Sequence, residues 1–168
     1  YFIDLNGSLW SVGSDFGGEL GNGGADIAVS SPIKVVDGNV TSVSSSFDHV
    51  LFRDVNGSIL GFGEGDNHRL GHGSTSDLKS PDIIFDGNVT SFATGAIHSA
   101  FVLSDGSLWT VGRNNHGQLG KGNTASSSLP TKIVDANVTQ VATGYNHTLY
   151  LMKDGSVWGM GRNNTGSL

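Results

Sequence analysis

Three histidines recur at one spacing and are the first candidates for chemistry in this chain. His49, His98 and His147 lie 49 residues apart, and imidazoles are common metal ligands and general bases. Each histidine leads into a β-forming segment at the same phase of a repeat, where it can anchor the structure by hydrogen bonds to backbone. Equivalent atoms of adjacent units also lie too far apart to share the short bonds of a zinc site. We therefore interpret the three histidines as structural and expect no metal and no cofactor.

No other residues form a recognisable catalytic set. Serines are plentiful, but none lies in a Gly-x-Ser-x-Gly turn, and the chain has no cysteine. The glycine-rich string Gly17-Gly18-Glu19-Leu20-Gly21 lacks the Lys-Ser or Lys-Thr pair of a phosphate-binding loop. The sequence thus predicts a protein that is not an enzyme. The alternative is an enzyme or a carbohydrate-binding protein that uses channel-facing polar groups and Trp side chains.

The elements around these residues follow an internal repeat of about 49 residues. A Gly-Ser pair returns at spacings of 50, 49 and 49, and a large apolar residue stands two positions after each serine. The pairs are Gly7-Ser8, Gly57-Ser58, Gly106-Ser107 and Gly155-Ser156. The chain is therefore predicted to be one domain of repeated units, approximately residues 1–39, 40–88, 89–137 and 138–168.

Each unit contains four strand signals bounded by turn residues. In the second unit they cover residues 40–43, 49–53, 58–62 and 82–85, which we call strands a to d. Asn56-Gly57 between strands b and c predicts a type I′ hairpin, and Pro81 is expected at the start of strand d. Helical and parallel β-solenoids, the competing architecture, do not match this unit. The predicted fold is all-β, a partial β-propeller of about 3.5 four-stranded antiparallel blades.

Composition restricts the class of partner. The formal charge is −6, and the nine Lys and Arg residues form no basic run, so nucleic-acid binding through phosphate neutralisation is not expected. No segment reaches the roughly 18 apolar residues of a membrane span, so no membrane insertion is expected. Asn-x-Ser/Thr sequons fall in register with the repeat, which explains them as turn residues without glycosylation.

The third unit carries a family resemblance. The string Gly112-Arg113-Asn114-Asn115-His116-Gly117-Gln118-Leu119-Gly120, with Asp154-Gly155-Ser156 farther along, resembles the repeat of the regulator of chromosome condensation family. The resemblance covers the whole chain and implies a seven-bladed propeller that recognises other proteins. Guanine nucleotide exchange on a small GTPase, the activity of the founding member, is an alternative. Departures from the repeat pattern in the first two units are Asp15, Glu19, Gly65, His68 and Arg69.

A partner-binding surface is expected where equivalent loops differ between units. Antiparallel strand order places the a-to-b and c-to-d loops on one face of the propeller. The a-to-b loops contain Phe47, Ile97 and Tyr145, which we expect to form an arc of contact residues; the alternative is that they cap the core between blades. The candidate partner-binding residues are Phe16, Phe47, Asp48, His68, Arg69, Ile97, His116, Tyr145 and Asn146.

The ends of the partial ring are expected to expose apolar blade faces. The chain starts at Tyr1 inside a strand and stops at Leu168, and we interpret it as a piece of a longer protein or as half of a ring completed by a second copy. The expected partners are an unidentified protein and further copies of the chain. The cellular compartment does not follow from these residues.

Overall fold

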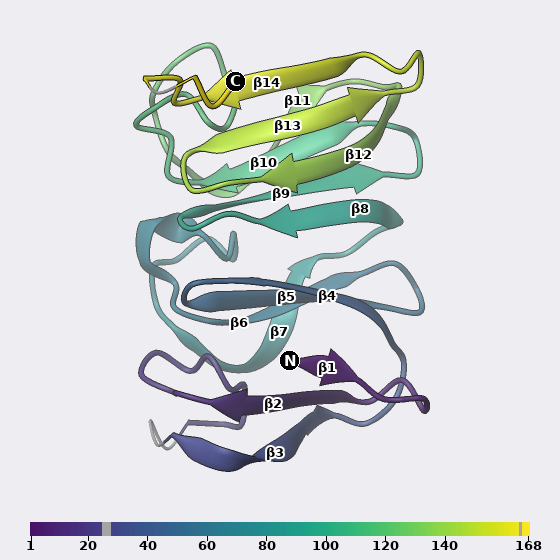
Figure 1. The fold of residues 1–168 in the computed structure, drawn as a ribbon, viewed down its shortest axis with the longest axis vertical. Helices are drawn as coiled ribbons and strands as arrows, with labels where there is room; N and C mark the ends of the chain where they lie inside the picture. Colours follow the sequence, from purple (N-terminus) through teal and green to yellow (C-terminus); the bar gives the residue numbers. More distant parts are fainter. Residues whose placement is uncertain (25–27, 165) are drawn as a thin grey trace.

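Four antiparallel sheets follow one another along the chain in a computed structural model, which describes residues 1–24, 28–164 and 166–168. The sheets are stacked from the N-terminal to the C-terminal one (Figure 1). Within each sheet the strands lie in sequence order, so neighbouring strands are joined by hairpin connections. This arrangement confirms the predicted all-β fold and the partial propeller of antiparallel blades.

We refer to the sheets as blades 1 to 4. Blade 1 contains β1 (Phe2–Ile3), β2 (Leu9–Gly13) and β3 (Val29–Val36). Blade 2 contains β4 (Val40–Ser46), β5 (His49–Asp54), β6 (Ile59–Gly63) and β7 (Leu78–Phe85), with the 3-10 turn η1 (Asp66–His68) before β7. Blade 3 contains β8 (Val89–Thr94), β9 (His98–Leu103), β10 (Leu108–Gly112) and β11 (Ser127–Val134). Blade 4 contains β12 (Val138–Thr143), β13 (His147–Met152) and β14 (Val157–Gly161).

Blades 2 and 3 therefore contain strands a to d, blade 1 contains strands b to d, and blade 4 contains strands a to c. Within the described part of the chain, no helix is long and apolar enough to cross a membrane.

The b-to-c turns differ from the predicted type I′ hairpins. Gly57 has a φ of +85°, but Asn56 is not among the residues with positive φ, whereas a type I′ turn needs both. The amide of Gly57 donates to the carbonyl of Asp54 at 3.2 Å, and the amide of Asp54 donates to that of Ser58 at 3.0 Å. This is a three-residue hairpin with a type I turn followed by a glycine bulge. The prediction of type I′ was wrong because only the glycine adopts the left-handed conformation.

Strand d also begins earlier than predicted. β7 starts at Leu78, so Pro81 lies inside the strand and not at its beginning. Gly61 pairs with Asp82 and Gly63 pairs with Leu78, so residues 79–81 lie opposite the single residue Phe62. The proline is tolerated there because a bulge interrupts the ladder of hydrogen bonds that it cannot join.

The hydrophobic core lies between the blades. Phe62 of blade 2 packs on Gly21 of blade 1, where an added Cβ would lie 2.9 Å from the ring. Val111 of blade 3 packs in the same way on Gly71 of blade 2. The apolar clusters at the three junctions are centred on Leu9, Val40, Val50, Phe52 and Phe62; on Leu51, Ile59, Leu70, Ile84, Val89, Phe101 and Val111; and on Ala100, Val102, Leu108, Val138 and Val141. Each blade therefore buries one face against the next, as predicted.

The repeated tryptophans are less buried than their periodicity suggests. Trp109 is half-buried against Phe85, with ring centroids 5.5 Å apart, and Lys132 lies over its indole. Trp158, at the same place in blade 4, is 56% exposed. The tryptophans thus cover the outer part of a blade, and Trp158 does not belong to the core.

Candidate protein-binding face

The connections of the blades fall into two groups at opposite edges of the stack. Loops joining strand a to b and strand c to d lie at the left edge in Figure 1, and the tight b-to-c and d-to-a turns lie at the right edge. We call the left edge the loop face and the right edge the turn face. The loop face consists of residues 47–48, 95–97 and 144–146 after strand a and residues 14–24, 64–77, 113–126 and 162–164 after strand c.

Phe47 and Tyr145 belong to the a-to-b loops of blades 2 and 4, yet their rings contact each other. The ring centroids are 5.5 Å apart and the planes make an angle of 82°, an edge-to-face arrangement. In blade 3 the equivalent residue is Ala96, which is buried. A methyl group at this place leaves room for the two rings to meet across blade 3. They remain 74% and 59% exposed, and we call them the aromatic pair.

The residue directly before each histidine fixes the a-to-b loop to the end of strand c by a backbone hydrogen bond. The backbone carbonyl of the residue before each histidine accepts a hydrogen bond from the first residue after strand c. These bonds run from Glu64 to Asp48 at 2.7 Å, from Arg113 to Ile97 at 3.0 Å and from Arg162 to Asn146 at 2.9 Å. Ile97 is half-buried and Asn146 is buried. Both lie one residue after the position of the aromatic pair, so the pair forms without Ile97.

Arg69 supports the loop face from within. Its side chain is 6% exposed, and its Nη1 lies 3.1 Å from Oδ2 of Asp48 and 2.8 Å from Oε2 of Glu64. Its Nε donates to the carbonyl of Asp66 at 2.9 Å. Burial raises the pKa of Glu64, an effect that Arg69 opposes and that the carboxylates of Asp48 and Asp66 strengthen. The guanidinium of Arg69 is therefore occupied by contacts inside the protein, whereas the side chain of Asp48 is 47% exposed.

The c-to-d loop of blade 3 shows why the family motif needs an asparagine. Oδ1 of Asn114 accepts from the amide of Leu119 at 2.9 Å, and its Nδ2 donates to the carbonyls of Asn123 and Ala125 at 2.8 and 3.0 Å. Asp15 of blade 1 accepts the equivalent bond from Leu20 at 3.2 Å. Because a carboxylate has no proton to donate, Asp15 cannot make the other two bonds.

The remaining predicted residues are spread over the loop face. Phe16 in blade 1 is 86% exposed, and His116 in blade 3 is exposed. His68 is half-buried, has a φ of +60° and places Nδ1 3.4 Å from the carbonyl oxygen of Ser74. These three side chains belong to the c-to-d loops of three different blades. Among the predicted residues, Phe47 and Tyr145 contact each other although they belong to different blades.

The repeated histidines join one blade to the next. Nε2 of His49 lies 3.0 Å from Oγ of Ser99, whose hydroxyl donates to the carbonyl of Arg69 at 2.8 Å. His98 bonds Thr148 at 2.8 Å, and Thr148 donates to the carbonyl of Gln118 at 2.9 Å. Since each hydroxyl proton is already donated, Nε2 of each imidazole is the donor. We call each such link a histidine clasp; blade 2 has Val50 in place of the hydroxyl residue.

Burial keeps the imidazoles of the two clasps neutral. Burial lowers the pKa of His49 to about 3, with Arg69 and His98 acting in the same direction, and burial lowers the pKa of His98 to about 4, with His147 adding to it. The expected bond to backbone was therefore wrong in detail: the histidine reaches the backbone through a hydroxyl of the following blade. Within residues 1–24, 28–164 and 166–168, no three acidic or histidine side chains are grouped to hold a metal.

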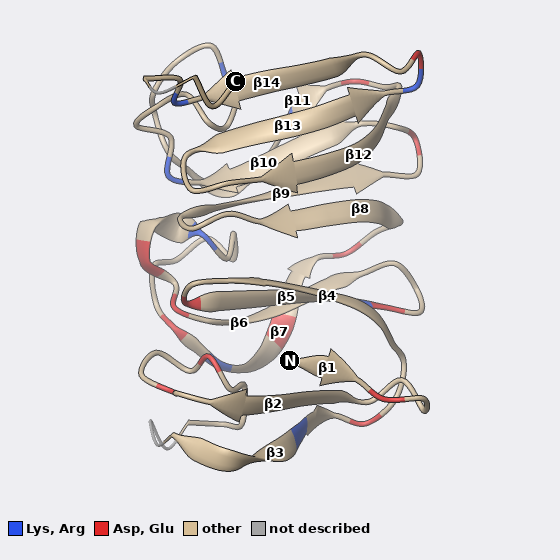
Figure 2. Cartoon of the chain, viewed as in Figure 1, with Lys and Arg blue, Asp and Glu red and all other residues tan. Residues whose placement is uncertain are grey.

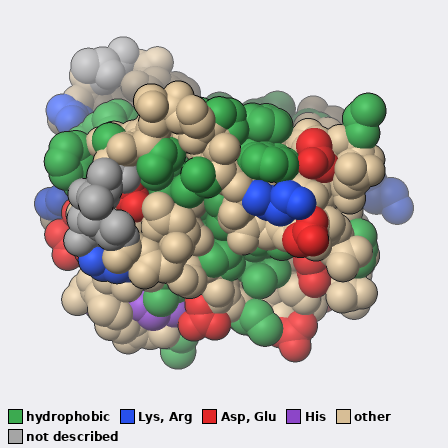
Figure 3. Space-filling model, turned by 90° about the horizontal axis from the view of Figure 1, so that it is seen from below, with side chains coloured by type: hydrophobic (Ala, Val, Ile, Leu, Met, Phe, Trp, Pro, Cys, Tyr) green, Lys and Arg blue, Asp and Glu red, His purple; other side chains and the backbone are tan. Residues whose placement is uncertain are grey.

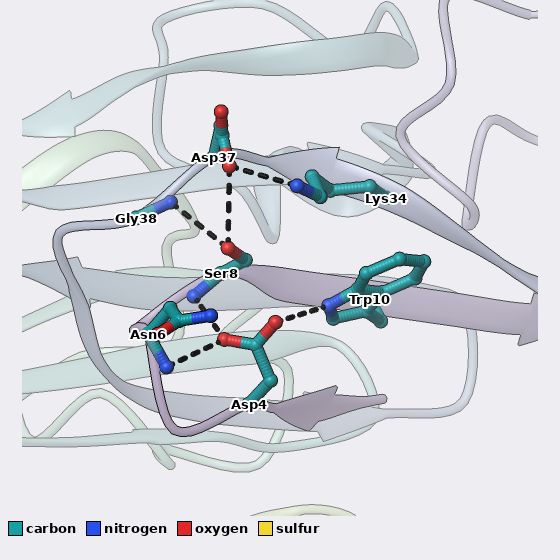
Figure 4. Close-up of polar contacts among 7 residues, drawn as sticks. All are labelled: Asp4, Asn6, Ser8, Trp10, Lys34, Asp37 and Gly38. Carbon is teal, nitrogen blue, oxygen red and sulfur yellow. Dashed lines mark hydrogen bonds and ion pairs between the residues drawn. The ribbon is translucent and has the colours of Figure 1, made fainter.

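The turn face is occupied by its own polar contacts. In blade 1, Asp4 accepts from the amides of Asn6 and Ser8 at 2.9 and 3.0 Å and from the indole of Trp10 at 2.9 Å (Figure 4). The indole bond is the main cause that lowers the pKa of Asp4. Asp37 accepts from Ser8 and pairs with Lys34 at 2.8 Å. Because these groups bond each other within the turns, few of them are left for a partner.

A groove of about 520 Å³ opens between blades 2 and 3 on the turn face. Arg53 lines it, at a place where the other blades carry aliphatic residues. Its Nη1 donates to the carbonyls of Val89 and Thr90, both at 3.1 Å, and its Nε donates to Thr41. Arg53 thus links the two blades, a role that the repeat pattern does not predict.

The outer blades each present an apolar face. Figure 3 views the stack from the side of blade 1, where hydrophobic side chains gather. Phe2 and Val12 are 45% and 43% exposed and occupy the places that Phe52 and Phe62 use in blade 2 to pack against blade 1. In blade 4, Val157 is 67% exposed at the place that Ile59 uses to pack against blade 3.

These stacked antiparallel sheets, with their core between the blades, define a protein of the β-propeller class. The Regulator of chromosome condensation (RCC1) repeat matches residues 56–102 and 105–151, and a second model of the same repeat matches residues 89–118 and 138–167. The matched segments cover more than half of the sequence, and the chain belongs to the RCC1 repeat family.

Solved structures agree on the fold. Human WBSCR16 superposes with a TM-score of 0.82 at 24% identity, over 96% of this chain and 45% of that chain. Yeast RCC1 (Prp20), in a crystal structure with Kap60, superposes with a TM-score of 0.84 at 19% identity, over 98% of this chain and 42% of that chain.

The E3 ubiquitin-protein ligase HERC2 of Homo sapiens is 36% identical over 81 residues, which are 46% of this chain and 2% of HERC2. The chain thus spans less than half of each of these relatives.

Proposed function

We propose that this chain is a non-enzymatic, protein-binding part of a propeller and that it recognises its partner through the loop face. The observation that carries the proposal is the aromatic pair of Phe47 and Tyr145, which is exposed although the rings contact each other. Aromatic side chains that are held rigidly at a surface are typical anchors of protein interfaces.

Comparison between the blades supports a role beyond folding. Blade 3 carries Ala96 where blades 2 and 4 carry the aromatic residues, and all three blades form strands a to c. The scaffold therefore does not need an aromatic side chain at this place. Yeast Prp20, whose fold is similar, is described in its binding to Kap60, Gsp1p and histones, which supports protein recognition as the general role.

Affinity capture with quantitative mass spectrometry tests this proposal. The chain, the variant Phe47→Ala/Tyr145→Ala and the control Leu5→Ala are used as baits in extracts of the source organism. Leu5 is a fully exposed apolar residue of the turn face. We expect proteins captured by the wild type and the control to fall by roughly tenfold or more with the double variant, because anchor residues contribute most of the binding energy.

Three further assays separate the alternatives. A glycan array and a panel of hydrolase substrates test the carbohydrate-binding and enzymatic alternatives, and release of labelled GDP from small GTPases tests nucleotide exchange. Captured proteins that are unaffected by the double variant would show that the loop face is not the recognition surface. Glycan binding without any captured protein would contradict the proposed protein-binding function.

A further inference from the structure

The first residue after strand c changes its charge between blades. Glu64, Arg113 and Arg162 occupy this place in blades 2, 3 and 4, and their amides make the same hydrogen bond to the a-to-b loop. The accepting residues directly follow the places of Phe47, Ala96 and Tyr145 in the sequence. The backbones of the three charged residues therefore lie next to the loop positions of the aromatic pair and Ala96. The scaffold does not require a charge of either sign at this place.

The rest of the loop face follows the same division (Figure 2). The loops of blades 1 and 2 carry acidic side chains, and the loops of blades 3 and 4 carry basic ones. The described acidic residues are Asp15, Glu19, Asp48, Glu64, Asp66 and Asp77, and the basic residues opposite them are Arg113, Lys121 and Arg162. Residues 113–126 contain no Asp or Glu.

The two halves differ in how far their charge is compensated inside the chain. In the acidic half, the buried guanidinium of Arg69 contacts both Asp48 and Glu64. In the basic half, the side-chain amide of Asn115 is oriented so that its oxygen accepts hydrogen bonds from Arg113. This oxygen lies 3.0 Å from Nε and 2.8 Å from Nη2 of Arg113. Among the described residues, this neutral partner orients Arg113 and no carboxylate is paired with it. Arg162 is exposed and lines a hollow of about 500 Å³ together with Tyr145.

We propose that the loop face binds an extended partner segment with one large apolar side chain and neighbouring Asp or Glu residues. This inference rests on the proposed function. The apolar side chain packs on the aromatic pair, and the carboxylates lie over Arg113 and Arg162. A guanidinium matches a carboxylate through two parallel hydrogen bonds, and the acidic half repels the same segment when it binds in the opposite direction.

Selection from a random peptide library on phage tests the inference without a known partner. The probe is the library of twelve-residue peptides, and the baits are the chain, Arg113→Glu/Arg162→Glu, and Lys153→Glu as a matched charge reversal on the turn face. We expect wild-type binders to carry an aromatic or large aliphatic residue beside Asp or Glu. Their affinity falls roughly tenfold with the double reversal and stays unchanged with Lys153→Glu, because contacting charges act locally.

The outcomes distinguish the two proposals. Binders that need Phe47 and Tyr145 but show no preference for Asp or Glu overturn this inference and leave the proposed function standing. Binders that are indifferent to the aromatic pair, or the absence of enriched peptides, overturn both. Equal binding of a twelve-nucleotide single-stranded DNA through Arg113 and Arg162 also overturns the inference, because the basic half would then recognise any anionic polymer.

Discussion

At the scale of single residues, the histidine clasps are the feature with the clearest chemical consequence. The Nδ1 atoms of His49 and His98 are buried and have no hydrogen-bond partner in the described structure. A proton added to either imidazole would sit on this nitrogen, in a place where nothing accepts it. Both rings must therefore stay neutral for the blades to remain joined.

We expect the stability of the chain to fall in mildly acidic solution. The unfolded chain binds a proton at each imidazole near pH 6.5, whereas in the folded chain the pKa is about 3 for His49 and about 4 for His98. The stability is thus fully present above pH 6.5 and decreases as the pH falls towards 4, because the unfolded state binds more protons. The slope is at most about 1.4 kcal/mol per pH unit for each histidine, and urea unfolding from pH 8 to 4 measures it.

His49→Gln is the informative variant for this prediction. A glutamine amide can still donate to Ser99 but does not titrate, so the slope should lose the contribution of one histidine. His116→Gln, at an exposed position that takes no part in a clasp, serves as the control for the substitution itself. An unchanged slope in His49→Gln would contradict the assignment.

The role of individual residues could be predicted only in part. The repeat fixes the phase of His49 and so indicates a structural role, but the partner Ser99 is 50 residues away, and one sequence does not say how far a blade is rotated from its neighbour. The contact between Phe47 and Tyr145 was missed for the same reason. Two signals in the sequence could have indicated these features. Aligning the residues two places before each histidine shows that Ala96 replaces an aromatic residue in the third unit. Aligning Glu64, Arg113 and Arg162 shows the change of charge.

At the scale of elements, the c-to-d loops hold the blades together by close approach of the backbone. Gly71 has a φ of +82°, and a Cβ added there would lie 2.9 Å from Cγ1 of Val111 in the next blade. Gly117 has a similar φ of +76°, but a Cβ there would meet nothing within 4 Å. The two glycines thus share the same backbone requirement and differ in packing.

This difference gives a matched pair of substitutions. Gly117→Ala should cost about 1 to 2 kcal/mol of unfolding free energy, the strain of a left-handed conformation with a Cβ. Gly71→Ala should cost about 1 to 3 kcal/mol more, because Val111 is branched at Cβ and cannot move away easily. Chemical denaturation of both variants measures the difference, and equal losses would mean that the junction between blades 2 and 3 can shift to admit a methyl group.

Strand existence and order followed from the sequence, whereas strand ends did not. Alternation and turn residues identify the strands of blade 2, because those patterns depend on neighbours along the chain. The bulge that admits Pro81 inside β7 depends on how β6 pairs with β7, and the turn at Asn56 depends on the bonds of Asp54. These are properties of paired strands, so a pattern in a single strand does not predict them.

At the scale of the whole molecule, the two end faces expose apolar side chains of a kind that is buried between the other blades. Phe2 and Val12 in blade 1 and Val157 in blade 4 are partly exposed, although their equivalents are buried between blades. Water contact with such a surface is unfavourable in proportion to its apolar area. A further blade of the same design, or another copy of the chain, would cover it.

We therefore expect the isolated chain of residues 1–168 to self-associate through its ends. Sedimentation velocity at micromolar concentration should show species larger than a monomer. Val12→Lys/Val157→Lys should return the chain to a monomer, since each lysine places a charge in the contact. Leu5→Lys, which changes an exposed residue of the turn face, should not. A monomer that unfolds cooperatively across this concentration range would refute the expectation.

The clasps are not distributed evenly, and this determines which junctions side-chain bonds hold under a pulling force. His49 and His98 each fasten a blade to its successor, whereas Val50 offers no hydroxyl between blades 1 and 2. Arg53 adds a second fastening between blades 2 and 3. A pulling force shared along the chain thus meets a histidine clasp at both junctions between blades 2 and 4, so the surface where Phe47 and Tyr145 meet is held by side-chain bonds as well as by the packed core.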